Sequence, residues 1–264
     1  QIPFLLTIIL SLLQWRVKRP DLGIEFNGLM NYIKIFSDKD FYSVVINTLI
    51  ISGVSLILCL ILGLAFALLL NRDFKGVIVA RTLFIIPYFI MPTVIGIVWK
   101  SLILNPAFGL NGYLANSLGL KSVDFLGAYS LFSIILLVVW RWTPFIFLIL
   151  LAGLQNIPPS ILESARIDGA NGWKMLLFIK IPSIMSYIKI AVMLGLVYIL
   201  RVFGLIYVTT KGGPGISSAN LPYYVYRSAF FEWDMGIASA TAVITVAISL
   251  IIIFFYYKQM SKNF

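Results

Sequence analysis

The sequence of 264 residues contains no histidine and a single cysteine, Cys59. Catalytic histidine pairs, zinc sites and disulfide frameworks need these residues, so most hydrolase chemistry and every disulfide-stapled fold are excluded. Charged residues are also scarce, at 11% of the chain against roughly 25% in a typical soluble domain. A water-soluble globular protein is therefore excluded.

Acidic residues are missing from the long apolar runs, because every Asp and Glu lies in a connection between them. Pumps and ion-coupled carriers commonly use carboxylates or histidines within the membrane as proton relays. The chain also lacks a phosphate-binding loop of the form G-x-x-x-x-G-K-[ST]. If the chain takes part in transport, we expect its energy to come from elsewhere, with any ATP hydrolysed on another polypeptide.

Apolar and aromatic residues make up 61% of the sequence, and its mean hydropathy is +1.00. Backbone groups in lipid must bond within their own segment, so apolar runs of about 20 residues are helices. Five such runs are expected at about 44–70, 77–99, 129–153, 183–208 and 236–257. A shorter run within 1–15 is interpreted as the end of a truncated first span. The fold prediction is an all-α polytopic membrane protein with six transmembrane helices in a single domain covering residues 1–264.

The net charge of +10 does not indicate binding of nucleic acid, because the Lys and Arg residues are scattered singly or in pairs without a basic stripe. Contact with lipid headgroups explains it more simply. Counts of Lys and Arg on the two sides of the membrane are nearly equal, so they do not fix the orientation.

The connection 156–182, which we name the elbow, carries most of the functional information. Pro158 and Pro159 are expected to end the preceding helix, and Ser160 with Glu163 three residues later predicts a capping box that starts a new one. That helix should stop near Gly169, followed by a turn and a second short helix. The resulting helix-turn-helix has an apolar face outside the bilayer, and such a face needs a partner.

The elbow resembles the "EAA" loop of the membrane subunits of binding-protein-dependent ATP-binding cassette importers. The matching run is Glu163-Ser164-Ala165-Arg166-Ile167-Asp168-Gly169-Ala170, closed by Ile179-Lys180-Ile181-Pro182. In that family this loop is a coupling helix that docks on the ATPase subunit from the cytoplasm. The resemblance assigns ATPase coupling to Glu163, Ala165, Asp168, Gly169 and Ala170, although Glu163 and Gly169 also suit plain helix capping.

A second run is similar to the maltose-type carbohydrate permeases, and to the first permease of the pair that such systems usually contain. It comprises Thr209-Thr210-Lys211-Gly212-Gly213-Pro214-Gly215, Tyr224-Val225-Tyr226-Arg227-Ser228-Ala229-Phe230 and Gly236-Ile237-Ala238-Ser239-Ala240. The stretch from Pro87 to Thr93 is closest to polyol permeases. The resemblance therefore implies a permease subunit of an ATP-driven importer for a carbohydrate or a polyol.

The same resemblance implies the partners and the location of the chain. The expected partners are a second homologous permease, two ATP-binding cassette subunits, an extracytoplasmic solute-binding protein and membrane lipid, without nucleic acid. The chain itself is expected to bind no cofactor or metal and to have no catalytic residue, with ATP and Mg on the ATPase subunits. The location is the inner cell membrane, which the chain crosses several times.

Arg141 is the most unusual residue of the apolar runs, because a charge in mid-span costs about 2.5 kcal/mol or more unless it faces protein or water. Trp140 and Trp142 flank it, and aromatic faces with charged donors suit sugars and polyols. Arg201, with Tyr198 and Phe203, is a second candidate for the solute path. Arg141 could instead bond carbonyls freed by Pro144, and Arg201 could reach the headgroups.

Two further interpretations of the whole chain remain open. The same machinery could import a phosphorylated small solute such as a glycerol phosphate, for which Arg141 and Arg201 are apt. From a different class, the chain could be an ATP-independent channel or scaffold. An intramembrane enzyme has almost no support, because nucleophile, base and metal ligands are missing.

Overall fold

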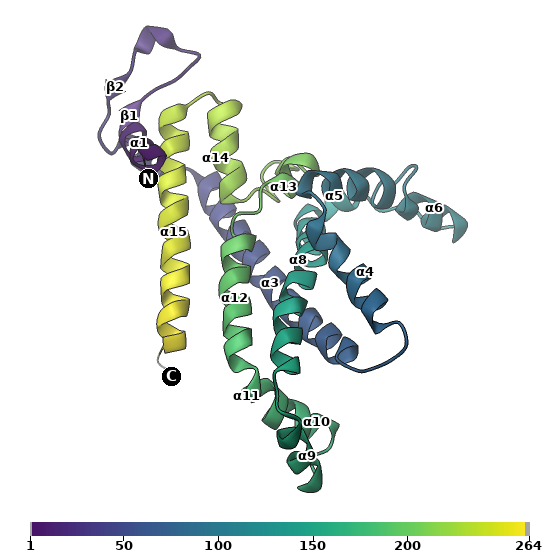
Figure 1. The fold of residues 1–264 in the computed structure, drawn as a ribbon. Helices are drawn as coiled ribbons and strands as arrows, with labels where there is room; N and C mark the ends of the chain where they lie inside the picture. Colours follow the sequence, from purple (N-terminus) through teal and green to yellow (C-terminus); the bar gives the residue numbers. More distant parts are fainter. Residues whose placement is uncertain (1, 262–264) are drawn as a thin grey trace. The chain divides into compact units, whose positions relative to one another are not determined.

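The computed structural model describes residues 2–261, and within them the chain is almost entirely helical (Figure 1). The predicted all-α fold with several apolar helices is confirmed. Residues 1 and 264, the outer limits of the predicted domain, lie outside the described residues. Residue 1 is also the start of the first predicted span. The chain forms two compact units, unit 1 with residues 1–52, 91–137 and 200–255, and unit 2 with residues 53–90, 138–199 and 256–264.

Unit 1 contains the first helix of the chain, most of the last helix and most of the short connecting elements. Its complete elements are α1 (Ile2–Ser11), β1 (Leu13–Gln14), η1 (Pro20–Leu22), β2 (Glu25–Phe26), α2 (Met30–Ser37), α5 (Pro92–Val98), the π-helical η2 (Trp99–Ile103), α6 (Leu110–Ser117), α7 (Phe125–Ala128), α13 (Gly204–Val208) and α14 (Leu221–Phe230). It also holds the first parts of α3 (Lys39–Leu70) and α8 (Ser130–Gln155) and most of α15 (Met235–Ser261).

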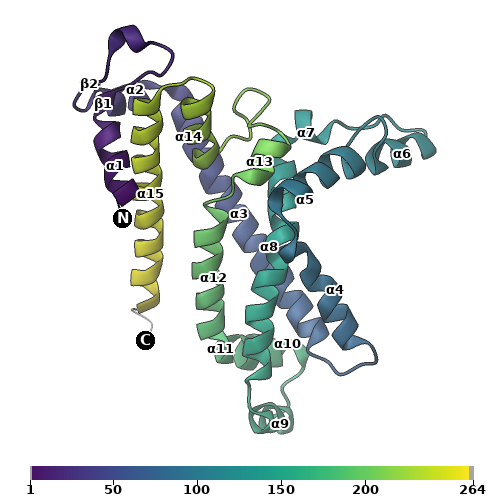
Figure 2. The ribbon, with the colours of Figure 1, turned by 45° about the horizontal axis from the view of Figure 1, so that its top comes forward.

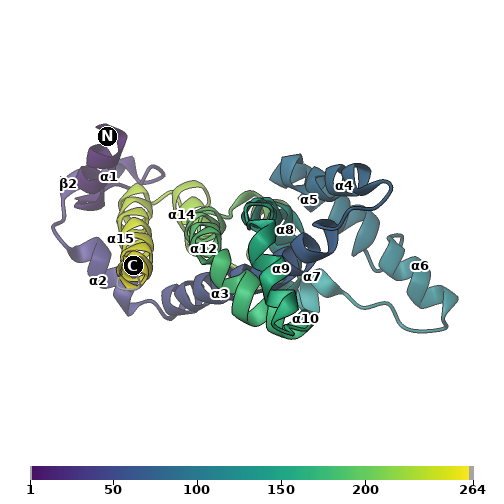
Figure 3. The ribbon, with the colours of Figure 1, turned by 60° about the horizontal axis from the view of Figure 1, so that its bottom comes forward.

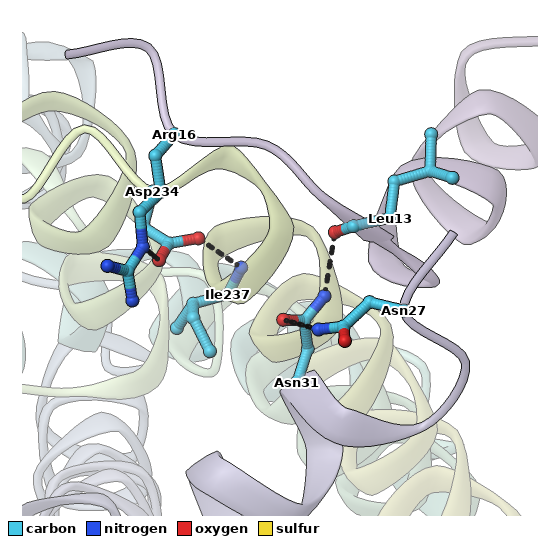
Figure 4. Close-up of polar contacts among 6 residues, drawn as sticks. All are labelled: Leu13, Arg16, Asn27, Asn31, Asp234 and Ile237. Atoms are coloured by element: carbon cyan, nitrogen blue, oxygen red, sulfur yellow. Dashed lines mark hydrogen bonds and ion pairs between the residues drawn. The ribbon is translucent and has the colours of Figure 1, made fainter. Parts of the chain in front are cut away.

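The segment after α1 is fastened to the start of α15, which sequence reasoning does not predict. The antiparallel pair β1–β2 places Leu13 opposite Phe26. Buried Asn31 donates to the carbonyl oxygens of Ser11 and Leu13, each at 2.9 Å. Figure 4 shows the bond to Leu13. Gly236 of α15 lies so close that a Cβ there would be 2.4 Å from the Leu13 oxygen. The side-chain amide of Asn31 and the close approach at Gly236 therefore fix the segment after α1 in place.

Asp234 belongs to the same junction and accepts hydrogen bonds from two groups (Figure 4). One carboxylate oxygen accepts from the backbone N–H of Ile237 at 3.0 Å, in the first turn of α15. The other accepts from Nε of Arg16 at 2.9 Å. An acidic residue at this position stabilises the helix start, because it satisfies an N–H group and suits the positive end of the helix dipole.

Unit 2 contains the remainder of α3 and α8 with α4 (Val77–Phe89), α9 (Pro159–Ile167), α10 (Gly172–Lys174), the π-helical η3 (Met175–Lys180), α11 (Ile181–Ser183) and α12 (Met185–Ile199). Figures 2 and 3 show α12 beside α8. Gly153 of α8 allows this packing, because a Cβ there would be 2.7 Å from the ring of Tyr187. Gly63 approaches Ile146 in the same way, at 3.0 Å. Small residues let helices pack closely where lipid offers no hydrophobic driving force.

Three helices within residues 2–261 are long and apolar enough to cross a membrane by themselves: Lys39–Leu70, Ser130–Gln155 and Met235–Lys258. The number rises to five if two interrupted pairs, Val77–Phe89 with Pro92–Ile103 and Gly172–Ser183 with Met185–Ile199, each count as one span. The helix α1 is shorter, with ten residues.

The fifth predicted span, 183–208, differs most from the observed helices. The helix α12 ends at Ile199, residues 200–203 are not helical, and α13 covers only Gly204–Val208. The third predicted span, 77–99, is interrupted where Ile90 and Met91 adopt extended backbone before Pro92. A proline disfavours helical geometry in the residue before it, so Pro92 begins a new helix instead of continuing the old one.

Candidate functional site

The elbow begins with a proline and not with the predicted capping box. The helix α9 starts at Pro159, and its N-cap residue is Pro158, with no hydrogen bond from a capping side chain. The prediction that Ser160 and Glu163 form a capping box is therefore wrong. A proline at the first helical position has the required φ and lacks an N–H that would need a partner. Glu163 is exposed, so its carboxylate is accessible to a partner.

The end of α9 is a Schellman motif built around Gly169. The N–H of Gly169 bonds to the carbonyl of Arg166 at 3.1 Å, and that of Ala170 to the carbonyl of Ala165 at 2.9 Å. Gly169 has φ +78°, which favours glycine, and nothing lies within 4 Å of a Cβ built there. The predicted stop is thus close to the observed end at Ile167. The open space beside Gly169 leaves room for close approach by another molecule.

Three of the predicted coupling residues line one groove on the elbow. The groove has a volume of about 430 Å³ and is lined by Ser160, Ile161, Ser164, Ala165, Asp168, Ala170 and Ile179. Beside it the elbow exposes large apolar side chains: Ile167 is 86%, Trp173 74% and Phe178 72% exposed. The second half of the elbow is the predicted second helix, continuous over Gly172–Ser183 through α10, η3 and α11, with a π-helical middle that the sequence did not predict; α12 is bent by 68° from it.

Arg141 and Trp142 of α8 lie in a cluster of aromatic rings within unit 2. Trp142 stacks on Tyr198 of α12 with ring centroids 5.1 Å apart and 16° between planes. The ring of Tyr88 of α4 stacks on Phe145 at 5.4 Å, and both contact Trp142 at 5.8 Å. The guanidinium carbon of Arg141 lies 4.8 Å from the Trp142 ring centroid. We name Tyr88, Arg141, Trp142, Phe145 and Tyr198 the aromatic cluster.

Two buried donors in the aromatic cluster have no hydrogen-bond partner among residues 2–261: Nε of Arg141 and Nε1 of Trp142. Buried donors of this kind are rare in proteins, because each lost hydrogen bond costs about 1–3 kcal/mol. In the alternative expectation, Arg141 bonds carbonyls freed by Pro144. Its Nε makes no such hydrogen bond within the described residues. Two donors beside stacked rings can bind hydroxyl or other acceptor oxygens of a polar molecule.

Sequence reasoning identified Arg141, Trp142 and Tyr198 but missed Tyr88 and Phe145. Phe145 lies four residues after Arg141, which is the spacing of neighbours on one helix face, so this signal was available. Tyr88 comes from another helix and only the tertiary structure brings it to the cluster. Trp140, the third predicted residue of α8, is 36% exposed.

The other two predicted path residues, Arg201 and Phe203, belong to unit 1. Arg201 is exposed and lines a pocket of about 450 Å³ with Thr245 and Ser249 of α15. The Phe203 ring stacks on Tyr207 at 5.5 Å and contacts Tyr226 at 5.1 Å. Arg201 therefore faces hydroxyl groups and apolar side chains, whereas Phe203 is part of a tyrosine-rich group.

A charged pocket of about 560 Å³ lies in unit 1 beside α14. It is lined by Asp40, Lys211, Gly215, Ile216, Tyr223, Arg227, Phe231 and Glu232. Arg227 and Glu232 form an ion pair at 3.2 Å. Next to them, burial raises the pKa of Tyr224, and the hydrogen bond that its hydroxyl donates to Asp38 at 2.7 Å raises it further. Tyr224 therefore stays protonated, and both signs of charge are presented at this surface.

Comparison with known proteins gives matches along most of the chain. The model of a family described as "Binding-protein-dependent transport system inner membrane component" matches residues 59–259. The trehalose/maltose transport system permease protein MalF of Thermococcus litoralis is 37% identical over 235 residues, covering 88% of this chain and 79% of that protein. The sn-glycerol-3-phosphate transport system permease protein UgpA of Agrobacterium fabrum is 30% identical over 244 residues, covering 92% and 83%.

A solved structure gives the same result at the level of the fold. One chain of a bacterial ABC transporter involved in the import of the acidic polysaccharide alginate matches with a TM-score of 0.81 and 26% identity. The match covers 97% of this chain and 88% of that chain. The similarity in sequence and the similarity in structure therefore point to one kind of protein.

Proposed function

Because the chain belongs to the family of inner membrane components of binding-protein-dependent transport systems, we propose that it is the permease subunit through which an importer moves a carbohydrate or a polyol. Membership of that family makes the chain a membrane subunit of a transport system and not an enzyme by itself. Its apolar helices place it in the membrane, which is the inner membrane for this family. The proposal adds the class of solute and the roles of individual residues.

The aromatic cluster is the observation that carries the choice of solute. Stacked rings contact the C–H faces of a sugar, and the unpartnered donors of Arg141 and Trp142 bind its hydroxyl groups. A related protein is named as a trehalose/maltose permease, which supports the same class. Trp140 and Tyr198 are the further solute-path residues proposed in unit 2, and Arg201 and Phe203 are those proposed in unit 1 on the basis of the sequence.

The elbow is the proposed contact with the ATPase subunits. Glu163 is exposed, the groove contains Ala165, Asp168 and Ala170, and Gly169 leaves room for a partner. ATP and Mg bind to the two ATPase subunits in this proposal, and no cofactor binds to this chain. Closure of the ATPase pair on ATP moves the elbows, and the helix bundle alternates between inward-facing and outward-facing states.

The other proposed partners are a second, homologous permease and a solute-binding protein on the outside. Successive connections of a polytopic protein alternate between the two sides of the membrane. The connection 209–235 follows the elbow after one span, so a cytoplasmic elbow places 209–235 outside. Its charged pocket, with Lys211, Arg227 and Glu232, offers charge complementarity to the binding protein.

The decisive experiment is solute-dependent ATP hydrolysis by the complex that copurifies with the full chain. The loaded binding protein should stimulate hydrolysis when it carries a neutral sugar or polyol. The variant Trp142→Phe, which keeps a smaller aromatic ring and removes the indole N–H, should reduce that stimulation. A complex that hydrolyses ATP equally with every solute or without any would overturn the proposal. Uptake without any copurifying ATPase would instead support the channel interpretation.

A second candidate is a phosphorylated small solute, because one relative is named as a permease for sn-glycerol-3-phosphate. Arg141 would then bind a phosphate group and not hydroxyl groups. The same assay separates the two candidates, since the stimulating solute is either neutral or anionic.

A further inference from the structure

A pocket of about 360 Å³ in unit 2 shares Ala170 with the groove of the proposed ATPase contact but is otherwise lined by different residues, and its composition is not explained by that contact. It is lined by residues from the end of α3 and from both halves of the elbow, all within unit 2. Its lining residues are Leu68, Asn71, Arg72, Arg166, Ala170, Asn171, Gly172, Met175, Leu176 and Lys180. We name it the basic pocket.

The charge of the basic pocket has one sign only. Arg72, Arg166 and Lys180 line it, and no carboxylate is among its lining residues in the described chain. None of these three side chains has an ion-pair or hydrogen-bond partner within residues 2–261. Three cations that share one pocket repel one another, so an anion bound among them would lower the free energy of the folded chain.

Neutral donors accompany the cations. The side-chain oxygen of Asn171 accepts from the backbone N–H of Lys174 at 3.0 Å, which leaves its amide nitrogen as a donor. Asn71, directly after α3, supplies a second amide. Guanidinium forks with amide donors match the several oxygens of a phosphate group, which accepts bidentate hydrogen bonds from arginine.

The apolar part of the basic pocket indicates where the phosphate group comes from. Leu68, Met175 and Leu176 line it, and the membrane-spanning helix α3 ends at Leu70. The end of a spanning helix lies at the level of the lipid headgroups, where basic pockets bind anionic lipids. A free phosphate ion would contact the cations but would gain nothing from the leucines and the methionine.

We propose that the basic pocket binds a phosphate group at the membrane surface, and that an anionic phospholipid with its glycerol against Leu68 and Leu176 supplies it. The bound lipid connects the end of α3 to the elbow, because Arg72 directly follows α3 and Arg166 and Lys180 belong to the elbow. The activity of the transporter would then depend on the anionic lipid content of the membrane.

The test uses the complex that copurifies with the full chain, in nanodiscs of phosphatidylcholine to which phosphatidylglycerol is added. Native mass spectrometry measures how much phosphatidylglycerol remains bound as its content rises. Each cation near the surface contributes a factor of about five, so Arg72→Gln combined with Lys180→Gln should weaken retention ~30-fold. Lys75→Gln is the matched control, because it removes a charge from the same turn without lining the pocket.

Four outcomes distinguish the two possible sources of the ligand from failure of the proposal. Retention of phosphatidylglycerol that inorganic phosphate does not displace supports the lipid, whereas displacement by inorganic phosphate supports the phosphate site with a soluble ligand. Equal retention in the double variant and the unaltered chain overturns the proposal. So does loss of the ATPase subunits from the double variant with unchanged lipid retention, because the pocket would then be a contact between subunits.

A second variant guards against misfolding of the first. Asn71→Asp leaves all three cations in place and adds a negative charge, so it should also weaken retention, while the elution profile of the complex stays that of the unaltered protein. These measurements do not depend on which solute is transported, so they fail independently of the proposed function.

Discussion

Arg81 and Arg141 are two arginines of unit 2 with opposite surroundings. Arg81 donates from Nε and Nη2 to the carbonyl oxygen of Leu70, at 3.0 and 2.6 Å, and so caps the end of α3. Nε of Arg141 has no such partner within the described residues and lies beside the ring of Trp142. The first arginine serves the fold, and the second is the one that we propose contacts the solute.

The substitution Arg141→Met tests this difference, because methionine keeps an unbranched apolar chain as far as the position of Nε and removes the charged guanidinium with its unpartnered donor. We expect unchanged or slightly raised thermal stability of the purified complex. Uptake should fall by ~10-fold or more, since a hydrogen bond to a charged group contributes about 1.5–3 kcal/mol. Thermal unfolding and solute uptake are measured on the same preparation.

Arg81→Met is the matched control for that experiment. It leaves the Leu70 carbonyl without its partner, so it should lower the unfolding temperature while the preference among solutes stays the same. If both variants lose stability equally and transport equally, Arg141 is a structural residue and the solute path lies elsewhere.

Gly169 is a second residue whose geometry leads to a sharp expectation. Gly169→Glu should abolish the coupling of ATP hydrolysis to transport while the chain still inserts into the membrane, because the new side chain occupies the open space beside the elbow. ATPase activity and uptake are measured in proteoliposomes. Normal uptake by this variant would contradict the docking role.

The matched control for Gly169 is Gly119, which has φ +66° and likewise nothing within 4 Å of a built Cβ. Gly119→Glu suffers the same strain of a left-handed backbone, about 1–2 kcal/mol, on a different connection. It should therefore transport normally. A loss of transport in both variants would indicate backbone strain and not docking.

Single residues were predictable where local chemistry decides and not where distant segments meet. Arg141 and Trp142 stand out because a charge and an indole in mid-span are unusual. Tyr88 has no such signal, since its contacts with Trp142 and Phe145 exist only after α4 packs on α8. The capping box failed because Pro158 and Pro159 fix the backbone before a serine side chain can act.

The long helices agree with their predicted ranges to within a few residues, because the thickness of a bilayer sets the length of an apolar run. The predicted 44–70 and 129–153 correspond to helices Lys39–Leu70 and Ser130–Gln155. Hydropathy does not record backbone hydrogen bonding, so the end of α12 at Ile199 and the π-helical η3 were not predictable. The β1–β2 pair was also missed, since two residues per strand leave no periodic pattern.

The packing of α8 on α12 leads to a prediction about helix contact. Gly153→Ala should lower the apparent unfolding temperature of the complex in detergent, because the new methyl group meets the ring of Tyr187 at 2.7 Å. Overpacking of this kind costs about 1–3 kcal/mol. Circular dichroism on heating measures the effect.

Gly53→Ala is the control, because it should change the unfolding temperature in the opposite direction in another long helix. Gly53 lies in the interior of α3 and has nothing within 4 Å of a built Cβ. Alanine should raise the unfolding temperature there, since it favours a helix by about 0.5–1 kcal/mol over glycine. Equal effects of the two substitutions would mean that α8 and α12 do not pack closely in the assembled protein.

The orientation of the entire chain can be tested with thiols, because its one cysteine, Cys59, is buried. In a Cys59→Ala background, Phe26→Cys should react with a membrane-impermeant maleimide in spheroplasts. Lys75→Cys, in the turn between α3 and α4, should react only after the membrane is permeabilised. The reverse pattern would place the elbow outside and exclude its contact with an intracellular ATPase.

The chain passes between its two units at five points, and at two of them the backbone has just left a helix. One lies between Ile90 and Met91, after α4 ends at Phe89, and the other lies between Ile199 and Leu200, at the end of α12. Non-helical backbone bends with less resistance than a hydrogen-bonded helix, so the chain can change direction at these two points without breaking helical hydrogen bonds. Tyr88 and Tyr198 lie within two residues of these breaks, so a change of backbone angle at either break would displace a ring that is stacked in the aromatic cluster.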